Sequence, residues 1–214
     1  MSKDVIQQGR LPACNINSAF MDKLWNILGS EGDFTWEAKV GTDDDLLGEK
    51  EEQNRSEQIV TEWSELTALL AALPRIDSLK ITVEIPGQGS LAIMIKSYAP
   101  ARGALAVSGD SAEWVNAKFA DIEELFVSSK DSFAAGLYSY IGFGMIHTVI
   151  PLSAAFVIVM LLAGLLIPSE IRHSDWVWWI TAICLLITLR LAYTISDRLM
   201  LHFMKKYPYL RWLS

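Results

Sequence analysis

The sequence predicts an α+β fold: a small antiparallel sheet with helices on one face, followed by a two-helix transmembrane hairpin. Two apolar runs, at 148–167 and 176–195, predict the hairpin, because each is twenty residues long and a helix of that length crosses a bilayer core of about 30 Å. Segments that alternate apolar and polar residues, interspersed with segments of helical period, predict the sheet and its helices. We therefore expect a soluble acidic head at 1–132 and a membrane domain at 133–214.

The first part of the head should contain one helix and one strand. Residues 1–15 are expected to be irregular. A helix should run from residue 17 or 18 to Gly29, because its apolar residues recur at spacings of four and three. A strand is expected at 34–40, where apolar and polar residues alternate strictly, and an acidic loop at 41–55. The apolar residues of the helix are Phe20, Leu24, Ile27 and Leu28.

The second part of the head should begin with a helix at 56–73, whose apolar residues also follow a helical period and which Pro74 ends. Strands are expected at 79–85 and 90–98, joined by a Pro-Gly turn, with a third strand at 103–107. The apolar residues of the helix are Ile59, Trp63, Leu66, Leu70 and Leu73.

A last head helix should begin at Asp110, which would cap it together with Glu113. Its inner face should contain Val115, Phe119, Ile122 and Phe126. We expect this helix to continue through 128–132 towards the membrane, so that a direct helical link would join Asp110 to Ile167.

The membrane domain begins with a glycine-containing juxtamembrane segment at 133–147. As one helix with 148–167 it would be about 50 Å long, which exceeds a single perpendicular crossing. The segment therefore lies in the interface or extends the first span as a tilted helix. Aromatic residues predict both interfaces: Trp176, Trp178 and Trp179 at one, and Tyr207, Tyr209 and Trp212, in the basic and aromatic tail at 196–214, at the other.

Charge is divided unevenly along the chain. Residues 1–132 contain 12 Lys and Arg against 22 Asp and Glu, a net charge of −10, and residues 133–214 contain 6 against 3, a net charge of +3. These add up to the −7 of the whole chain. A head with this much negative charge argues against a nucleic acid partner. The affinity of proteins for nucleic acids comes largely from contacts of Lys and Arg with phosphates. The head should also stand off an anionic leaflet.

The head offers few groups for catalysis. It contains no histidine and one cysteine, Cys14, near an N-terminus that is expected to be loose. This excludes a Ser-His or Cys-His nucleophile pair and a Cys/His zinc site within the head. The chain lacks a P-loop and a dinucleotide-binding glycine motif, and the acidic loop lacks the ligand spacing of an EF-hand. We expect no enzyme, no cofactor and no metal.

One candidate binding site lies at the start of the last head helix. Ser108, Asp110, Ser111 and Lys118 are its residues, because free N–H groups at a helix N-terminus attract an anion. The alternative is an ordinary helix cap, in which the Asp110 carboxylate takes the place of the anion.

A second set of candidates lies in the membrane domain, where we expect contacts between helices. His147 and Arg190 are ionisable, and such residues in spans commonly face a bundle interior, a partner or water. Arg190 is also close enough to the end of its span to extend to the interface. Small residues allow close approach of helices. The small residues of this set are Gly136, Gly142 and Gly144.

Basic residues predict the orientation. The tail carries four, whereas the bridge between the spans carries only Arg172, so the tail should be cytoplasmic. Two spans then place the head in the cytoplasm as well. The N-terminus has no apolar stretch of the kind found in a signal peptide.

The leading functional hypothesis is a sensor–effector. The head would bind a small molecule or a cytoplasmic protein, and the hairpins would form a homo-oligomer that perturbs the lipid bilayer. By architectural analogy, a bacterial stress or antiviral response at the inner membrane would suit this design. The alternative is a non-catalytic scaffold that recruits a cytoplasmic partner to the bilayer.

Overall fold

The computed structural model describes residues 5–30, 32–42, 56–73, 76–97, 103–167 and 175–213. The chain divides into two compact units. The head unit contains Met1–Ser139 together with Met204–Ser214, and the helical unit contains Tyr140–Phe203. Most of the predicted acidic loop, residues 43–55, and the predicted bridge at 168–174 lie outside the described residues.

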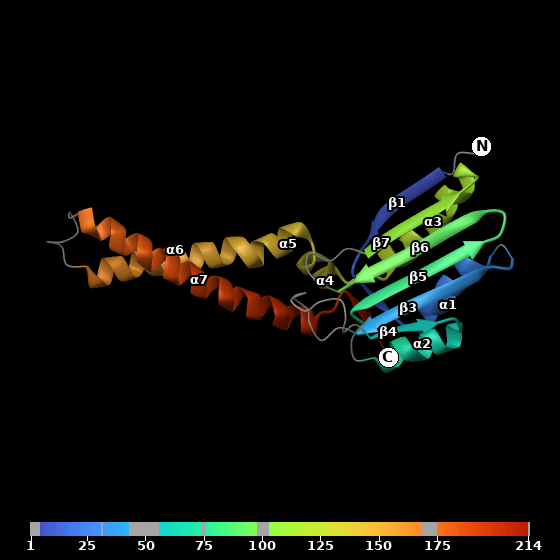
Figure 1. Cartoon of the computed structure of the whole chain (residues 1–214), viewed down its shortest axis with the longest axis horizontal. Coiled ribbons are helices and arrows are strands. Elements are labelled where there is room, and N and C mark those ends of the chain that lie inside the picture. Colours follow the sequence, from blue (N-terminus) through green and yellow to red (C-terminus); the bar gives the residue numbers. More distant parts are fainter. Residues whose placement is uncertain are drawn as a thin grey trace. The chain divides into compact units, whose positions relative to one another are not determined.

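The head unit is built on a six-stranded antiparallel sheet with the strand order β1-β7-β6-β5-β3-β4 (Figure 1). Every second residue of β5 and β6 is buried, which is the pattern of a sheet with one covered face. The predicted strands at 34–40, 79–85, 90–98 and 103–107 are confirmed, with ends shifted by one or two residues. The strands are β1 (Val5–Leu11), β3 (Thr35–Thr42), β4 (Ser56–Val60), β5 (Ser78–Ile85), β6 (Gly89–Lys96) and β7 (Gly103–Gly109).

Helices α1 (Ser18–Gly29) and α3 (Ala112–Ser128) lie on the same side of this sheet (Figure 1). Their buried residues meet in the core, where the rings of Phe20 and Phe126 pack edge to face with centroids 5.1 Å apart. The four residues predicted for the inner face of α3 are all buried. The shorter helix α2 (Trp63–Ala72) adjoins the edge strand β4. The predicted α+β class is confirmed.

The prediction that residues 1–15 are irregular is wrong from Val5 onward. Strand β1 pairs with β7 along its whole length, and β2 (Cys14–Ile16) follows it. The alternation of β1 is hidden because its inward positions include Gln7 and Gly9. Glycine fits at position 9 because a Cβ there would overlap the end of the Phe119 ring, which would have to shift. Cys14 is buried rather than loose, and burial raises the pKa of its thiol to about 12.

The predicted helix at 56–73 is two elements. Its first five residues form β4, which pairs with β3, and the helix begins only at Trp63. Ile59 fits the helical period in the sequence but is 58% exposed in the structure. The strand is favoured because pairing with β3 satisfies the backbone and buries Val60.

The start of α3 also differs from the prediction. Its N-cap is Ser111, whose Oγ accepts a hydrogen bond from the Trp114 N–H at 3.4 Å. Asp110, the predicted cap, comes one residue before it and is exposed. The shift by one residue moves Glu113 out of the third helical position, so the predicted capping box does not form.

The direct helical link from Asp110 to Ile167 is wrong as well. After α3 the chain leaves the helical path, and the Asp131 N–H donates to the Ala13 carbonyl at 3.0 Å. The Asp131 carboxylate then caps the short helix α4 (Ser132–Leu137) by accepting hydrogen bonds from two of its N–H groups. A second break at Tyr138 and Ser139 ends the head unit.

The C-terminal segment is part of the head unit. Strand β8 (Leu210–Trp212) pairs in parallel with β2, and Cys14 lies opposite Leu210. The Tyr209 hydroxyl donates to the Leu11 carbonyl at 2.6 Å and accepts from the Gly103 N–H at 2.8 Å, so it bridges the ends of β1 and β7. Burial raises the pKa of Tyr209, which keeps the hydroxyl protonated and able to make both bonds.

The helical unit contains two long helices. The first run comprises α5 (Tyr140–Gly144), the π-helical turn η2 (Met145–Val149) and α6 (Ile150–Leu166), and the second is α7 (Asp175–Lys206). Two segments, Tyr140–Leu165 and Trp176–Lys206, are long and apolar enough to cross a membrane. They contain 26 and 31 residues, so both exceed the predicted runs at 148–167 and 176–195.

The predicted juxtamembrane segment at 133–147 is divided between the two units. Its first residues form α4, which belongs to the head unit. Residues 140–147 extend the first long helix. The sequence allowed this segment to lie in the interface or to extend the first span. Extension of the first helix applies only to residues 140–147.

Replacing Tyr209 by Phe should lower the free energy of unfolding of the head unit by about 1–3 kcal/mol, because the buried Gly103 N–H and Leu11 carbonyl would lose their partner. Urea unfolding of the full chain in detergent, followed by tryptophan fluorescence, measures the loss. Tyr207→Phe is the matched control, since the described contacts of Tyr207 involve only its ring. Equal stability of the two variants would show that the Tyr209 hydroxyl is dispensable.

Candidate functional site

The helical unit contains an ionisable pair between its two long helices. Nε2 of His147 lies 2.8 Å from Oδ1 of Asp197, and both side chains are partly exposed. His147 comes from η2 in the first helical run, and Asp197 comes from α7. The contact is an ion pair when the imidazole is protonated and a hydrogen bond to the carboxylate when an N–H on Nε2 of the neutral ring donates.

The local sequence explains the π-helical turn that carries His147. Pro151 has no backbone N–H, so it cannot donate to the carbonyl of His147, four residues earlier. The ring of Pro151 also crowds that carbonyl, and the chain widens from an α-helix to a π-helix immediately before it. The wider turn is the segment that meets α7.

Aromatic and hydroxyl groups surround the pair. The ring of Phe143 stacks on the imidazole, with centroids 5.1 Å apart and planes 21° apart, and the ring of Tyr193 lies 5.9 Å away. The buried Ser196 hydroxyl donates to the Ile146 carbonyl at 2.6 Å. This second bond joins the same two helices one residue before each member of the pair.

This arrangement is suited to holding helices together rather than to nucleophilic chemistry. The Ser196 hydroxyl donates a hydrogen bond to a backbone carbonyl and not to His147, so the imidazole does not activate this hydroxyl as a nucleophile. Polar contacts between helices in lipid are worth about 0.6 to 2 kcal/mol each. We call His147, Asp197 and Ser196 the polar clasp.

The membrane residues predicted from the sequence are only partly brought together. His147 is in the clasp, whereas Arg190 is exposed on α7 and its carbonyl accepts a hydrogen bond from the Thr194 hydroxyl. A Cβ on Gly136 or Gly144 would meet nothing within 4 Å. Within one chain these two glycines therefore make no close helix contact, and Gly142 is half-buried.

Asp197 and Ser196 are the clasp residues that the sequence prediction missed. The predicted second span ended at residue 195, which assigned both residues to the tail. The signal was present, because in an antiparallel hairpin with its bend near residue 171, His147 and Asp197 lie at almost equal distances from the bend. The length of α7 makes this pairing possible.

The candidate residues at the start of α3 are engaged in structural contacts. Ser108 Oγ lies 3.0 Å from Ser90 Oγ on the neighbouring strand, and Ser111 caps the helix. Lys118 is 2% exposed, and its Nζ donates to the Ile27 carbonyl and to Ser30 Oγ, each at 2.6 Å. These contacts fix the C-terminus of α1 against α3.

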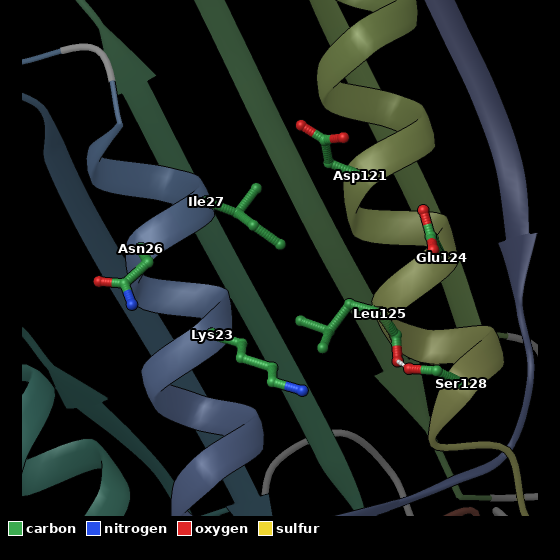
Figure 2. A pocket seen from close by; sticks show the side chains of 7 residues that line it. All are labelled: Lys23, Asn26, Ile27, Asp121, Glu124, Leu125 and Ser128. Atoms are coloured by element: carbon green, nitrogen blue, oxygen red, sulfur yellow. Dashed lines mark hydrogen bonds between the residues drawn. The ribbon is translucent and has the colours of Figure 1, made fainter.

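An open groove of about 430 Å³ lies between α1 and α3 (Figure 2). Ile27 and Leu125 supply its apolar surface, and Asp121 and Glu124 supply carboxylates on the α3 side. The sequence did not predict it, because the residues come from helices far apart in the chain. Its other lining residues are Lys23, Asn26 and Ser128.

The aromatic residues predicted at the interfaces differ in environment. Trp176, Trp178 and Trp179 are exposed near the start of α7. Tyr207 and Trp212 belong to the head unit, where the ring of Tyr207 packs on Phe133 at 4.6 Å and Trp212 lies in β8. No family model, no curated protein and no solved structure matches the chain.

A double-mutant cycle should detect the clasp. His147→Ala and Asp197→Ala should each destabilise the helical unit in mixed micelles, and their combined effect should be smaller than the sum by about 0.5–1.5 kcal/mol, because each removes the same contact. His147→Ala combined with Arg190→Ala is the control and should be additive. Additivity in the first cycle would contradict the clasp.

Proposed function

We propose that the protein is an integral membrane sensor–effector, in which ligand or protein binding by the head unit controls a membrane assembly formed by the helical unit. The observation that carries this proposal is the way the head unit holds both of its connections to the helical unit. The chain leaves the head unit after Ser139 and returns to it at Met204.

The two connections contact each other within the head unit. The ring of Phe133, in α4 on the outgoing connection, packs on Tyr207 of the returning one, and the rings of Tyr138 and Tyr209 pack edge to face at 5.1 Å. Each connection is also bonded to the sheet region, through Asp131 and Tyr209 respectively. A change in the head that moves this end of the sheet would therefore move both connections.

Exposure of apolar side chains supports membrane insertion. In the helical unit most large apolar residues are exposed, with Leu165 at 81% and Trp178 at 78%. Exposure of so large an apolar surface to water is unfavourable, whereas its exposure to the hydrocarbon core of a bilayer is favourable. The head and the C-terminal strand form one unit, so they belong on the same side of any membrane, and this agrees with two crossings.

The expected topology follows from the basic residues. The head unit and tail would be cytoplasmic in a bacterial inner membrane, with residues 168–174 outside. In a Cys184→Ala background, a membrane-impermeant maleimide should label Ser174→Cys from outside intact cells but not Asn26→Cys, which lies on the exposed surface of α1. Cys14 should stay silent, because it is buried and its thiol pKa is raised to about 12. Labelling of Asn26→Cys without labelling of Ser174→Cys would show that the topology is the reverse of the one proposed.

The effector reading requires association of several chains. Gly144 has open space around its Cα, so a larger side chain would disturb contacts with another chain while leaving its own chain intact. Gly144→Leu should reduce the oligomer in detergent and dye leakage from liposomes. A monomeric wild type that never leaks dye would defeat this reading.

A scaffold is the second candidate function, and the groove between α1 and α3 is the observation that favours it. A groove with an apolar floor and two carboxylates is suited to a basic amphipathic segment of a cytoplasmic protein. In that case the helices only anchor the chain, and charge reversal at the exposed Asp121 and Glu124 would abolish recruitment without changing membrane insertion.

A further inference from the structure

The face of the sheet opposite the helices is open, and one row of residues across it carries only basic charge. Its centre consists of small side chains from β6 and β7, among them Ala92, Ala104 and Ala106. Register places Arg10, Ala104, Met94, Lys80 and Lys39 in one row across five strands. Lys96 lies in the next row, opposite Ser78, and Glu57 of β4 lies at the other end of that row. We call Arg10, Lys39 and Lys80 the basic row.

Apart from Glu57, the acidic residues in the described strands of this face lie further along the sheet. Glu37 and Glu84 occupy the rows beyond the basic row. Lys39 and Lys80 lie directly opposite each other on adjacent strands, an arrangement of like charges that destabilises a sheet by itself. Lys39 Nζ is 3.3 Å from Glu37 Oε1, which offsets part of this repulsion. A bound anion would offset the rest.

The basic row lies at the end of the sheet where the chain leaves and re-enters the head unit. Arg10 is adjacent to Leu11, whose carbonyl accepts the Tyr209 hydrogen bond. Next to Ser78 and Lys96, Ile76 forms a β-bridge with Leu210 of the returning segment. If the helical unit spans a membrane, this end of the sheet is the one tethered closest to the lipid headgroups.

We propose that the basic row docks the head unit on anionic lipid headgroups of the membrane in which the chain is anchored. The inference rests on the proposed membrane insertion. Met94, 41% exposed between Lys80 and Ala104, offers an apolar side chain of the kind that enters the interface beside cations. The net charge of −10 repels the rest of the head from the leaflet, so that docking selects this one end.

The test uses the full chain in nanodiscs, in a Cys184→Ala background with Ala104→Cys carrying a fluorophore in the basic row. Quenching by a headgroup nitroxide lipid should be strong in phosphatidylcholine discs that contain phosphatidylglycerol and weak in pure phosphatidylcholine discs. The quenching in discs with phosphatidylglycerol should fall at about 1 M salt, because the Debye length is then about 3 Å and the charges are screened. Lys39→Gln with Lys80→Gln should reduce the docked-to-undocked ratio by about fivefold for each lysine.

Matched controls separate docking from folding and from insertion. Lys23→Gln, an exposed lysine of α1, should leave quenching unchanged, and a fluorophore on Ala112→Cys, at the far end of α3, should stay unquenched. Because the double lysine variant relieves a like-charge pair, its thermal midpoint in detergent should not fall. Quenching that is independent of phosphatidylglycerol, or that survives both substitutions, would overturn the proposal. A chain that does not enter nanodiscs would instead refute membrane insertion.

Discussion

The Tyr209 hydroxyl closes the head unit at the point on which the rest of the architecture depends. It bridges β1 and β7, and the segment around it adds β8 to β2. The returning segment is held in addition by β8 and by the β-bridge between Leu210 and Ile76, but the Tyr209 hydroxyl is its bond to both β1 and β7. A buried phenol that both donates and accepts makes a specific, shape-defining contact, since its loss leaves two backbone groups unsatisfied.

This closure holds the two connections to the helical unit together within the head unit. The chain leaves the head through the short helix α4, which Asp131 caps, and returns through the segment that contains Tyr207 and Tyr209. The polar clasp then joins the two long helices themselves. The two helices are thus connected at the head unit and again within the helical unit, and the proposed sensor–effector function depends on this double connection.

Local pattern was sufficient where a segment has a strong period of its own. Strand β5 and helices α1 and α3 follow from the spacing of residues such as Leu79, Leu24 and Phe119. The local sequence pattern did not predict the structure where pairing between strands determines it. Strand β1 hides its period behind Gly9, and residues 56–60 form an edge strand although Ile59 fits a helical spacing. A turn enforced by contacts with Ala13 and Asn15 cannot be seen in the helical pattern around Ser129.

Part of the site could be predicted, because an ionisable residue is rare in an apolar segment and often has a function there. His147 stood out for that reason. Its partner Asp197 did not, because it follows the apolar run, and the groove and the basic row depend on tertiary register that no local pattern contains. Sequence alone thus identified one member of the clasp and none of the surfaces of the head.

Hydrogen–deuterium exchange of the full chain in nanodiscs tests most directly whether the C-terminal segment is a structural part of the head. The peptide containing residues 207–213 should exchange as slowly as peptides from β7, because β8 pairs with β2 and the Leu213 N–H donates to the Ile16 carbonyl at 2.7 Å. Exchange of that peptide within seconds, while β7 stays protected, would mean that the tail is free, and the account of a head coupled to both helices would be wrong.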